Sequence, residues 1–408
     1  MAMKTSLPLP RWEFISLAAA LMALNALAID IMLPGLQEIG ASLGVADENH
    51  RQYVISAYLF GFGLAQLAYG PVSDRFGRRA PLLFGLGVYV VAALGASFAP
   101  SFAMLLALRF VQGTGAAATR VIAVSVIRDV FGGRAMAEIM SLVFMVFMII
   151  PVIAPNIGQL VMLFSEWHMV FVFMAAIGLA VTIWTALRLP ETLHPEYRRA
   201  FTLRSIAGGF GIVLSNRTSL CYTLATTIVF GALFGFINSA QQVYVGIYGL
   251  GVWFPVIFAV VAGMMAVSSF VNAQLVGKVG MRRLSHGALV GFFLVNSIMF
   301  GLSLLGPVPL PIFVGLFTAA MLQFGWIGSN FNSIAMEPLG HVAGTASSII
   351  GFIQTLGGSF IGAAIGQAFD GTVTPLAAGF CTVSAIGLVI VLIAERGKLF
   401  RAQSEPTR

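Results

Sequence analysis

The amino-acid sequence predicts an all-α membrane protein whose twelve transmembrane helices form two pseudo-symmetric bundles of six. The composition, the number of long apolar runs and the placement of the basic residues all indicate this fold class. Of the 408 residues, 59% are hydrophobic and 9% are charged, whereas soluble domains carry about 25% charged residues. The mean hydropathy of +0.95 places the chain in the membrane class before any motif is considered.

Twelve runs are long and apolar enough to cross a bilayer, which requires about 20 residues. They cover residues 14–36, 52–72, 81–99, 101–127, 137–163, 168–188, 218–245, 251–275, 285–305, 309–333, 344–368 and 374–394. The longest gap, 189–217, is polar and basic, and it divides the runs into six and six. The sequence therefore predicts a first bundle at 1–188, a cytoplasmic linker at 189–217, a second bundle at 218–395 and a cytoplasmic tail at 396–408.

The basic residues predict the orientation. If the N-terminus is cytoplasmic, all but three of the 22 lysines and arginines fall in cytoplasmic segments. The exceptions are Arg51, Arg109 and Arg120. Such an asymmetry in short loops sets the orientation of a membrane protein, so both termini are expected in the cytoplasm. It also explains the net charge of +7 through topology and contact with anionic lipid, and nucleic acid is not an expected partner.

Several other classes of protein find no support in the sequence. Cys221 and Cys381 lie in apolar runs without metal-ligand spacing, so no metal site is expected. There is no Walker A or HExxH motif, which argues against an ATP-driven pump or a membrane metalloprotease. Lys4 and Arg11 precede the first apolar run without a small-residue cleavage site after it, which indicates an uncleaved first helix. We expect no enzymatic activity.

A charged turn follows the second apolar run, where residues 70–79 read GPVSDRFGRR. Glycine and proline suit a tight turn, an aspartate can accept hydrogen bonds at a helix N-terminus, and arginines can pair with acids or lipid phosphates. A weaker copy at 277–283, GKVGMRR, lacks the acid. We therefore predict a conformational latch in the first half; the alternative is an ordinary basic loop. The latch residues are Gly70, Asp74, Arg75, Gly77, Arg78 and Arg79.

These segments resemble those of a known family. GPVSDRFGRR is similar to the loop 2–3 signature of the major facilitator superfamily. DIMLP at 30–34 and RFVQGTG at 109–115 resemble motifs of proton-coupled drug exporters. RD at 128–129, PVIAPNIG at 151–158 and GTASS at 344–348 resemble the Bcr/CflA multidrug resistance branch.

The resemblance implies a monomeric transporter of the bacterial inner membrane that contacts lipid. It would export small amphipathic or hydrophobic compounds, such as antibiotics, in exchange for protons by alternating access. No cofactor is implied beyond the proton as coupling ion.

The buried ions can be considered without the family. Asp30 is the sole acid well inside a predicted span, and an intramembrane ionisable residue is a functional candidate by default. Asp30 and Arg109 lie roughly 10 and 12 Å from the outer ends of their helices at 1.5 Å per residue, so they could pair. A carboxyl group that alternates between arginine and water would take up and release a proton. The alternative is a fixed structural ion pair. Pro34 cannot donate to the carbonyl of Asp30, which predicts a kink.

Two further features suggest movement or a gate. Arg120 lies eleven residues after Arg109 and on the same helix face; snorkelling to the inner boundary or pairing at a gate is favoured over substrate contact. Pro151, Pro155 and Gly158 predict a hinge or gate in the fifth helix, because prolines in spanning helices are tolerated where neighbours satisfy the freed carbonyls. Simple helix packing is the alternative.

Polar and aromatic residues at helical spacing predict a substrate cavity. An aromatic wall with a few polar groups suits amphipathic ligands, although hydrogen bonds between helices would explain the same residues. The candidates are Tyr58, Gln112, Phe234, Asn238, Gln242, Trp326 and Asn330. A symporter or facilitator for a metabolite such as a sugar or amino acid remains an alternative, as does a membrane sensor without transport. The direction of substrate movement would distinguish the first from an exporter.

Overall fold

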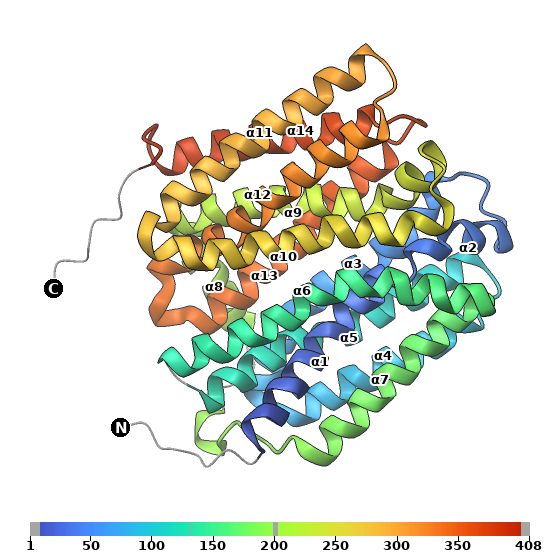
Figure 1. Ribbon diagram of the computed structural model, residues 1–408. Helices are drawn as coiled ribbons and strands as arrows, with labels where there is room; N and C mark the ends of the chain where they lie inside the picture. The colour runs from blue at the N-terminus through green and yellow to red at the C-terminus, as the bar shows by residue number, and fades with distance from the viewer. Residues whose placement is uncertain (1–8, 132, 199–202, 401–408) are drawn as a thin grey trace. The chain divides into compact units, whose positions relative to one another are not determined.

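A computed structural model describes residues 9–131, 133–198 and 203–400, apart from the side chains of 133–138, 141, 144–148, 197, 203–207, 209 and 340–345. Throughout these residues the regular secondary structure is helical (Figure 1). The helices before the linker are α1 (Arg11–Asp30), α2 (Leu36–Ser42), α3 (Tyr53–Phe76), α4 (Arg79–Ser97), α5 (Phe102–Val130), α6 (Gly133–Phe164) and α7 (His168–Arg188), with short 3-10 turns at Leu33–Gly35 and Asn49–Gln52.

The remaining helices follow α7. They are α8 (Leu203–Ser215), α9 (Arg217–Gln241), α10 (Phe254–Val279), α11 (Met281–Leu305), α12 (Leu310–Met336), α13 (Ala343–Gln367) and α14 (Thr374–Ala394). Short turns lie at Pro195–Tyr197, Gly251–Trp253 and Glu337–Val342, and a π-helical turn, Gln242–Ile247, extends α9. The helix α8 lies inside the segment 189–217, for which the sequence predicted only a polar linker.

The number of membrane spans agrees with the sequence. Eleven helical stretches in the described part of the chain are long and apolar enough to cross a bilayer. The predicted run 137–163 falls on the 32-residue helix α6. Several of its side chains lie outside the described residues, and its described apolar part is Ile149–Phe164. The prediction of an all-α membrane protein is confirmed.

The chain forms two compact units. One contains Met1–Asp47 and Tyr53–Gly208, and the other contains Glu48–Gln52 and Gly209–Arg408. The chain passes between them within α8 and again at the short segment 48–52, which follows α2 in the sequence yet packs with the second unit.

Each unit repeats the same pattern of helix packing. In the first unit α1 packs on α6, α3 on α5, and α4 on both α5 and α7. In the second unit α9 packs on α13, α10 on α12, and α11 on both α12 and α14. These pairs match when the first spanning helix of one unit is aligned with the first of the other. The shared topology is what two copies of one six-helix repeat would give.

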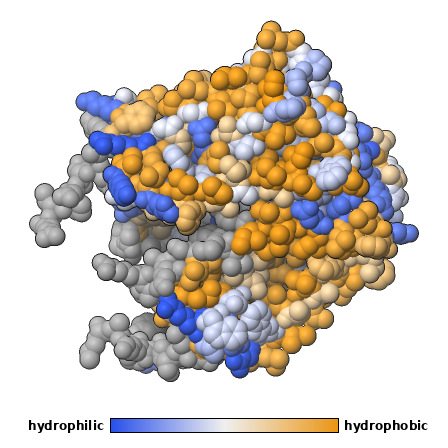
Figure 2. Space-filling model, in the orientation of Figure 1, coloured by the Kyte–Doolittle hydropathy of each residue, from blue (hydrophilic) through white to orange (hydrophobic). Residues whose placement is uncertain are grey.

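The surface is apolar along the helices. Large hydrophobic side chains such as Leu305 (86% exposed) and Phe84 (69% exposed) point outward. Figure 2 shows hydrophobic residues over most of the visible face, with hydrophilic residues gathered near helix ends. Because lipid replaces water as the solvent of such a surface, exposed apolar side chains are favourable there.

The predicted kink in the first spanning helix is present. The helix α1 ends at Asp30, and Pro34 lies in the 3-10 turn Leu33–Gly35 that leads into α2. Proline has no N–H to give the carbonyl of Asp30 and therefore ends the regular hydrogen-bond ladder. The last carbonyls of α1 are left needing other donors.

Candidate functional site: a buried polar cluster in the first unit

Asp30 is the last residue of α1 and is buried, with 3% of its surface exposed. Its Oδ1 atom has no hydrogen-bond partner among the described residues. An ionised carboxylate in hydrocarbon is costly unless it is paired. The break at Asp30 therefore carries a buried carboxyl group that its surroundings do not fully satisfy.

Arg109, on α5, is fully buried but well satisfied. Its guanidinium donates to the carbonyl of Ala28 at 2.9 Å, to the carbonyl of Val54 at 3.2 Å and to Oε1 of Gln112 at 2.7 Å. Ala28 is one of the last residues of α1, so Arg109 satisfies a carbonyl left free by the helix break. The charge also suits the negative end of the helix dipole.

The pair between Asp30 and Arg109 that their depths allow is not formed. Although both residues are described, no ion pair or hydrogen bond joins their side chains, and Arg109 instead binds the backbone of α1 two residues before Asp30. The depths calculated from the sequence put the two side chains at a similar level in the membrane, which agrees with the contact of Arg109 with the carbonyl of Ala28. The sequence could not show that backbone carbonyls would compete for the guanidinium.

Tyr58 and Asn25 extend this cluster. The Tyr58 ring lies under Arg109, with 4.5 Å from Cζ to the ring centroid, and its hydroxyl donates to Oδ1 of Asn25 at 3.1 Å. The Asn25 amide donates to Thr119 at 2.9 Å. Asn25 was missed in the sequence analysis, although a lone amide in the apolar run of α1 was a usable signal. We call Asn25, Tyr58, Arg109, Gln112 and Thr119 the arginine cluster.

Small residues allow the helices to approach closely at this cluster. A Cβ on Gly113 of α5 would collide with the carbonyl of Tyr58, and one on Gly61 of α3 would collide with the carbonyl of Phe110. Helix pairs in membranes pack tightly through such residues. The close packing of α3 on α5 places Tyr58 against Arg109.

The helix with the predicted hinge, α6, packs on the break in α1. A Cβ on Gly158 would collide with the carbonyl of Ile31, and one on Gly35 would meet the sulfur of Met162 at 2.7 Å. Pro151 and Pro155 lie earlier in α6, which remains helical through both. Gly158 thus holds α6 beside Asp30, and the hinge itself remains a prediction.

The charged turn at 70–79 forms a second cluster of the same unit. Arg78 is buried and pairs with Asp74 at 2.6 Å and with Asp129, at the end of α5, at 2.8 Å. It also donates to Ser73 at 2.8 Å. Burial alone would lower the pKa of Arg78, but its hydrogen bonds to Asp129 and Asp74 outweigh this and raise it. Ser73 in turn donates to the carbonyl of Gly70 at 2.9 Å.

Glu191, just after α7, caps the start of α4. Its carboxylate accepts from the backbone N–H of Arg78 at 2.8 Å and of Arg79 at 3.1 Å. A carboxylate is favourable at a helix N-terminus. Gly77 has a φ of +93°, and a Cβ there would collide with Glu191. The Arg79 side chain donates to the carbonyl of Ala186 at 2.6 Å, whereas Arg75 is exposed.

The second unit has a matching cluster. Arg282, in the first turn of α11, pairs with Glu395 at 3.0 Å and with Glu337 at 3.5 Å. Glu395 also accepts from the hydroxyl of Tyr222 at 2.7 Å. The missing acid of the second turn was our reason to place the latch in the first half alone. Acids at the ends of α12 and α14 nevertheless supply partners for Arg282, and the assignment of the latch stays a prediction.

The predicted cavity residues are mostly occupied with contacts inside their own units. Tyr58 and Gln112 belong to the arginine cluster. Trp326 donates to the carbonyl of Ser268 at 2.8 Å, and Asn330 donates to Asn272 at 2.7 Å, so both join α12 to α10. Asn238 donates to the carbonyl of Phe234 on its own helix at 2.8 Å. The contacts of Trp326 and Asn330 are hydrogen bonds between helices, as in the alternative interpretation, whereas that of Asn238 lies within its own helix.

Gln242 takes part in a polar clasp with the segment 48–52, which we define as Asn49, Gln52, Gln242, Gly366 and Gln367. The amide of Gln242 donates to Asn49 at 2.7 Å, and Gln52 donates to Gln242 and, at 3.0 Å, to the carbonyl of Gly366. Asn49 donates to the carbonyl of Gln367 at 3.1 Å, and Gln367 donates back to the carbonyl of Asn49 at 2.7 Å. The clasp holds the segment onto α9 and α13.

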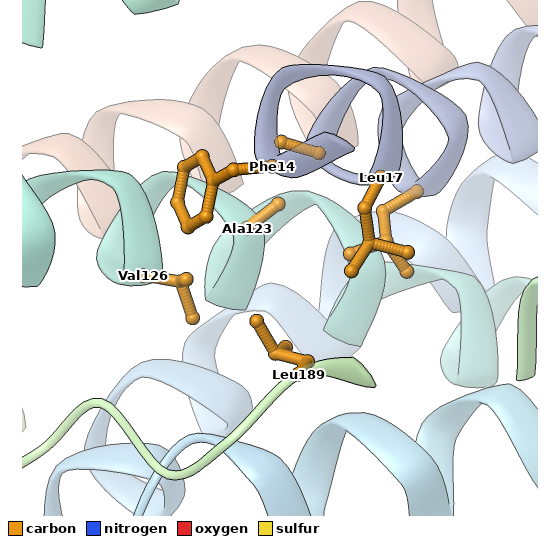
Figure 3. A pocket seen from close by; sticks show the side chains of 7 residues that line it. Phe14, Leu17, Ala123, Val126 and Leu189 are labelled. Carbon is orange, nitrogen blue, oxygen red and sulfur yellow. The ribbon is translucent and has the colours of Figure 1, made fainter. Parts of the chain in front are cut away.

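Two hollows in the first unit are apolar. Figure 3 shows a small one between α1, α5 and the chain after α7, where Phe14, Leu17, Ala123, Val126 and Leu189 face it. The other is a groove between α3 and α4 that includes Tyr69, Phe76, Phe84 and Thr114. Neither contains a charged side chain, so neither resembles a site for ion coupling.

Comparison with known proteins decides the family. The model of the Major Facilitator Superfamily matches residues 15–363. The chain belongs to the major facilitator superfamily. Members of this superfamily are secondary transporters, so the protein carries a small-molecule substrate across a membrane that it spans many times, and it is not an enzyme.

Relatives within the superfamily cover nearly the whole chain. A bicyclomycin resistance protein homolog of Haemophilus influenzae is 32% identical over 91% of this chain and 94% of its own length. The multidrug resistance protein MdtL of Escherichia coli is 30% identical over 96% of this chain and 98% of its own. The predicted resemblance to a drug-resistance branch of the superfamily is confirmed at this level of similarity.

Solved structures confirm the major facilitator fold. The xylose transporter XylE of E. coli, in a partially occluded inward-open conformation, matches 96% of this chain with a TM-score of 0.73 at 10% identity. The human organic anion transporter MFSD10 matches 95% with a TM-score of 0.68 at 17% identity. At such identities the likeness concerns the fold alone.

Proposed function

We propose that this superfamily member exports small, moderately hydrophobic compounds from the cytoplasm of a bacterium in exchange for protons. The two units would be the halves of an alternating-access transporter in the inner membrane, with both termini in the cytoplasm and with the monomer as the working form. The names of the relatives in Haemophilus influenzae and E. coli support drugs or antibiotics as substrates.

The observation that carries proton exchange is the environment of Asp30. Its carboxyl group is buried at the break of α1, and Oδ1 lacks a hydrogen-bond partner in the described structure. Protonation would remove the cost of an unpaired buried carboxylate. Access of water to the same group in another conformation would allow the proton to leave.

Arg109 would tune this step without holding the carboxylate permanently. Each of its three guanidinium nitrogens donates one hydrogen bond, to Val54, Gln112 and Ala28, and Ala28 lies two residues before Asp30. A shift of the α1 break would therefore move the carboxyl group and an acceptor of Arg109 together. The contact of Gly158 with Ile31 connects that shift to α6.

The test is transport by purified protein in proteoliposomes. A drug panel with chloramphenicol, bicyclomycin and a sulphonamide in an efflux-deficient host would first identify a substrate and the direction of transport. We then expect Asp30→Asn to abolish accumulation driven by an imposed proton gradient while substrate-for-substrate exchange continues. Glu38→Gln is the matched control, because Glu38 is an exposed acid on α2 nearby in the chain. Gradient-driven accumulation by Asp30→Asn at the wild-type level would refute the proposal.

A further inference from the structure

Arg120 of α5 differs from the other intramembrane arginine. Arg109 makes three hydrogen bonds. For Arg120, the described residues supply no hydrogen bond and no ion pair. Its guanidinium lies over the ring of Phe62, with 6.0 Å from Cζ to the centroid. Its side chain is partly exposed. An arginine within a spanning helix is costly unless it has a partner or a function.

The direction of the side chain argues against snorkelling to the end of the helix. Side chains on an α-helix lean towards its N-terminus, and the guanidinium of Arg120 follows this rule by lying at the level of Phe62. Phe62 is also beside Gly113, because a Cβ on Gly113 would meet the backbone nitrogen of Phe62 at 2.9 Å. The guanidinium therefore points to the middle of α5. The Cα atom of Arg120 lies ten residues, or about 15 Å, from the end of α5 at Val130.

The surroundings hold the guanidinium in place without neutralising it. Phe62 is buried and stacks on Tyr58 at 6.2 Å with 7° between the ring planes, and Tyr58 is fixed in turn by Asn25. An aromatic ring attracts a cation by its quadrupole but leaves the N–H donors free. A positioned guanidinium with free donors is suited to bind a planar anion such as a carboxylate through two parallel hydrogen bonds.

We propose that Arg120 binds the negatively charged group of an amphipathic organic acid, so that monoanionic compounds form one class of substrate. This rests on the proposed transport function and adds a substrate class to it. Asp30 would serve the proton and Arg120 the anion, which assigns separate tasks to two charged groups inside the spanning helices, one on α1 and one on α5, for which the described residues supply no ion pair. A structural or gating role of Arg120 would instead require an acid that binds it.

The experiment measures binding to full-length protein in nanodiscs by equilibrium dialysis. The probes are radiolabelled benzoate, salicylate and 2-naphthoate, each compared with its primary amide, which has a similar shape and no charge. We expect wild type to bind at least one acid more tightly than its amide. Arg120→Gln should weaken that acid about 10- to 100-fold and leave the amide unchanged, and Arg120→Lys should restore part of the affinity.

Lys398→Gln is the control for a general loss of positive charge, because Lys398 is exposed, and it should bind like wild type. The melting temperature of Arg120→Gln should fall only slightly, since among the described residues the side chain loses only its contact with the ring of Phe62. The proposal is overturned if no acid binds wild type more tightly than its amide, or if Arg120→Gln weakens acid and amide equally. Binding needs no proton gradient, so this result is independent of the Asp30→Asn test.

Discussion

The Nε atom of Arg282 donates to the carboxylate of Glu395 at 3.0 Å, although 113 residues separate them. In the first unit the Nε atom of Arg78 donates to Asp129 at 2.8 Å, and both arginines lie in the basic turn between the second and third spanning helices of their unit. The same turn is therefore held by acids in both halves. The acids lie far from the turn in the sequence, at the ends of the fourth and sixth spanning helices, which hid the likeness.

Replacement of Arg282 should destabilise the second unit. Arg282→Ala would leave Glu395, of which 12% of the side chain is exposed, without its cation, and breaking such a pair costs about 3 kcal/mol. Arg283→Ala is the control, because Arg283 is exposed and its one hydrogen bond among the described residues is a 3.5 Å contact with the carbonyl of Phe400. Unfolding by sodium dodecyl sulphate would measure both. Equal stability of the two variants would contradict the importance of the Arg282–Glu395 pair.

Glycine at position 77 should be required on two grounds. Its φ of +93° disfavours any residue with a Cβ, and a Cβ would also collide with Glu191. We expect Gly77→Ala to cost about 1–3 kcal/mol and to weaken the cap of α4. Gly87 lies within α4 and has open space around it, so Gly87→Ala should instead be neutral or slightly stabilising. A thermal shift assay would compare them, and a Gly77→Ala protein as stable as Gly87→Ala would contradict the expectation.

The fold was predictable because its signals are local and repeated. The spanning helices follow from the length of twelve apolar runs, and the division into two bundles follows from the gap at 189–217. The break in the first helix follows from the missing N–H of Pro34. A sequence shows all of these features directly. The site was less predictable, since its contacts are distant or involve the backbone. Arg109 binds the backbone carbonyls of Ala28 and Val54. Every residue has such a carbonyl, so the residue types do not identify these partners. Glu191 and Glu395 lie just after their helices, and nothing local identifies them as partners of Arg78 and Arg282.

The contact between α6 and the break in α1 should be sensitive to a single methyl group. Gly158→Ala places a Cβ on the carbonyl of Ile31, and overpacking of this kind costs about 1–3 kcal/mol. Because the shift falls beside Asp30, we expect proton-driven transport to decrease more than stability would explain. Gly263→Ala in α10, where the space is open, is the control. Unchanged transport by Gly158→Ala would mean that α6 and the break can separate freely.

The hydroxyl and the ring of Tyr58 should contribute separately. Tyr58→Phe removes the 3.1 Å bond to Asn25 and leaves a buried amide oxygen without that donor, at about 1–3 kcal/mol. Tyr58→Leu also removes the ring under Arg109 and should cost about 0.5–2 kcal/mol more. Denaturant unfolding of both variants would give the two differences. If Tyr58→Phe and Tyr58→Leu were equally stable, the ring would not stabilise the guanidinium.

The polar clasp should show energetic coupling between Gln52 and Gln242. Both side chains are buried, and Gln52 donates to Gln242, which donates in turn to Asn49. Gln52→Ala and Gln242→Ala each leave the other amide with an unmet partner, so the double variant should be less destabilised than the sum, with a coupling of about 0.5–3 kcal/mol. Gln323, which bonds to its own helix at Ala319, provides the control pair with Gln52 and should be additive. Additivity of Gln52 with Gln242 would show that the segment 48–52 is held by the backbone contacts at Gly366 and Gln367 instead.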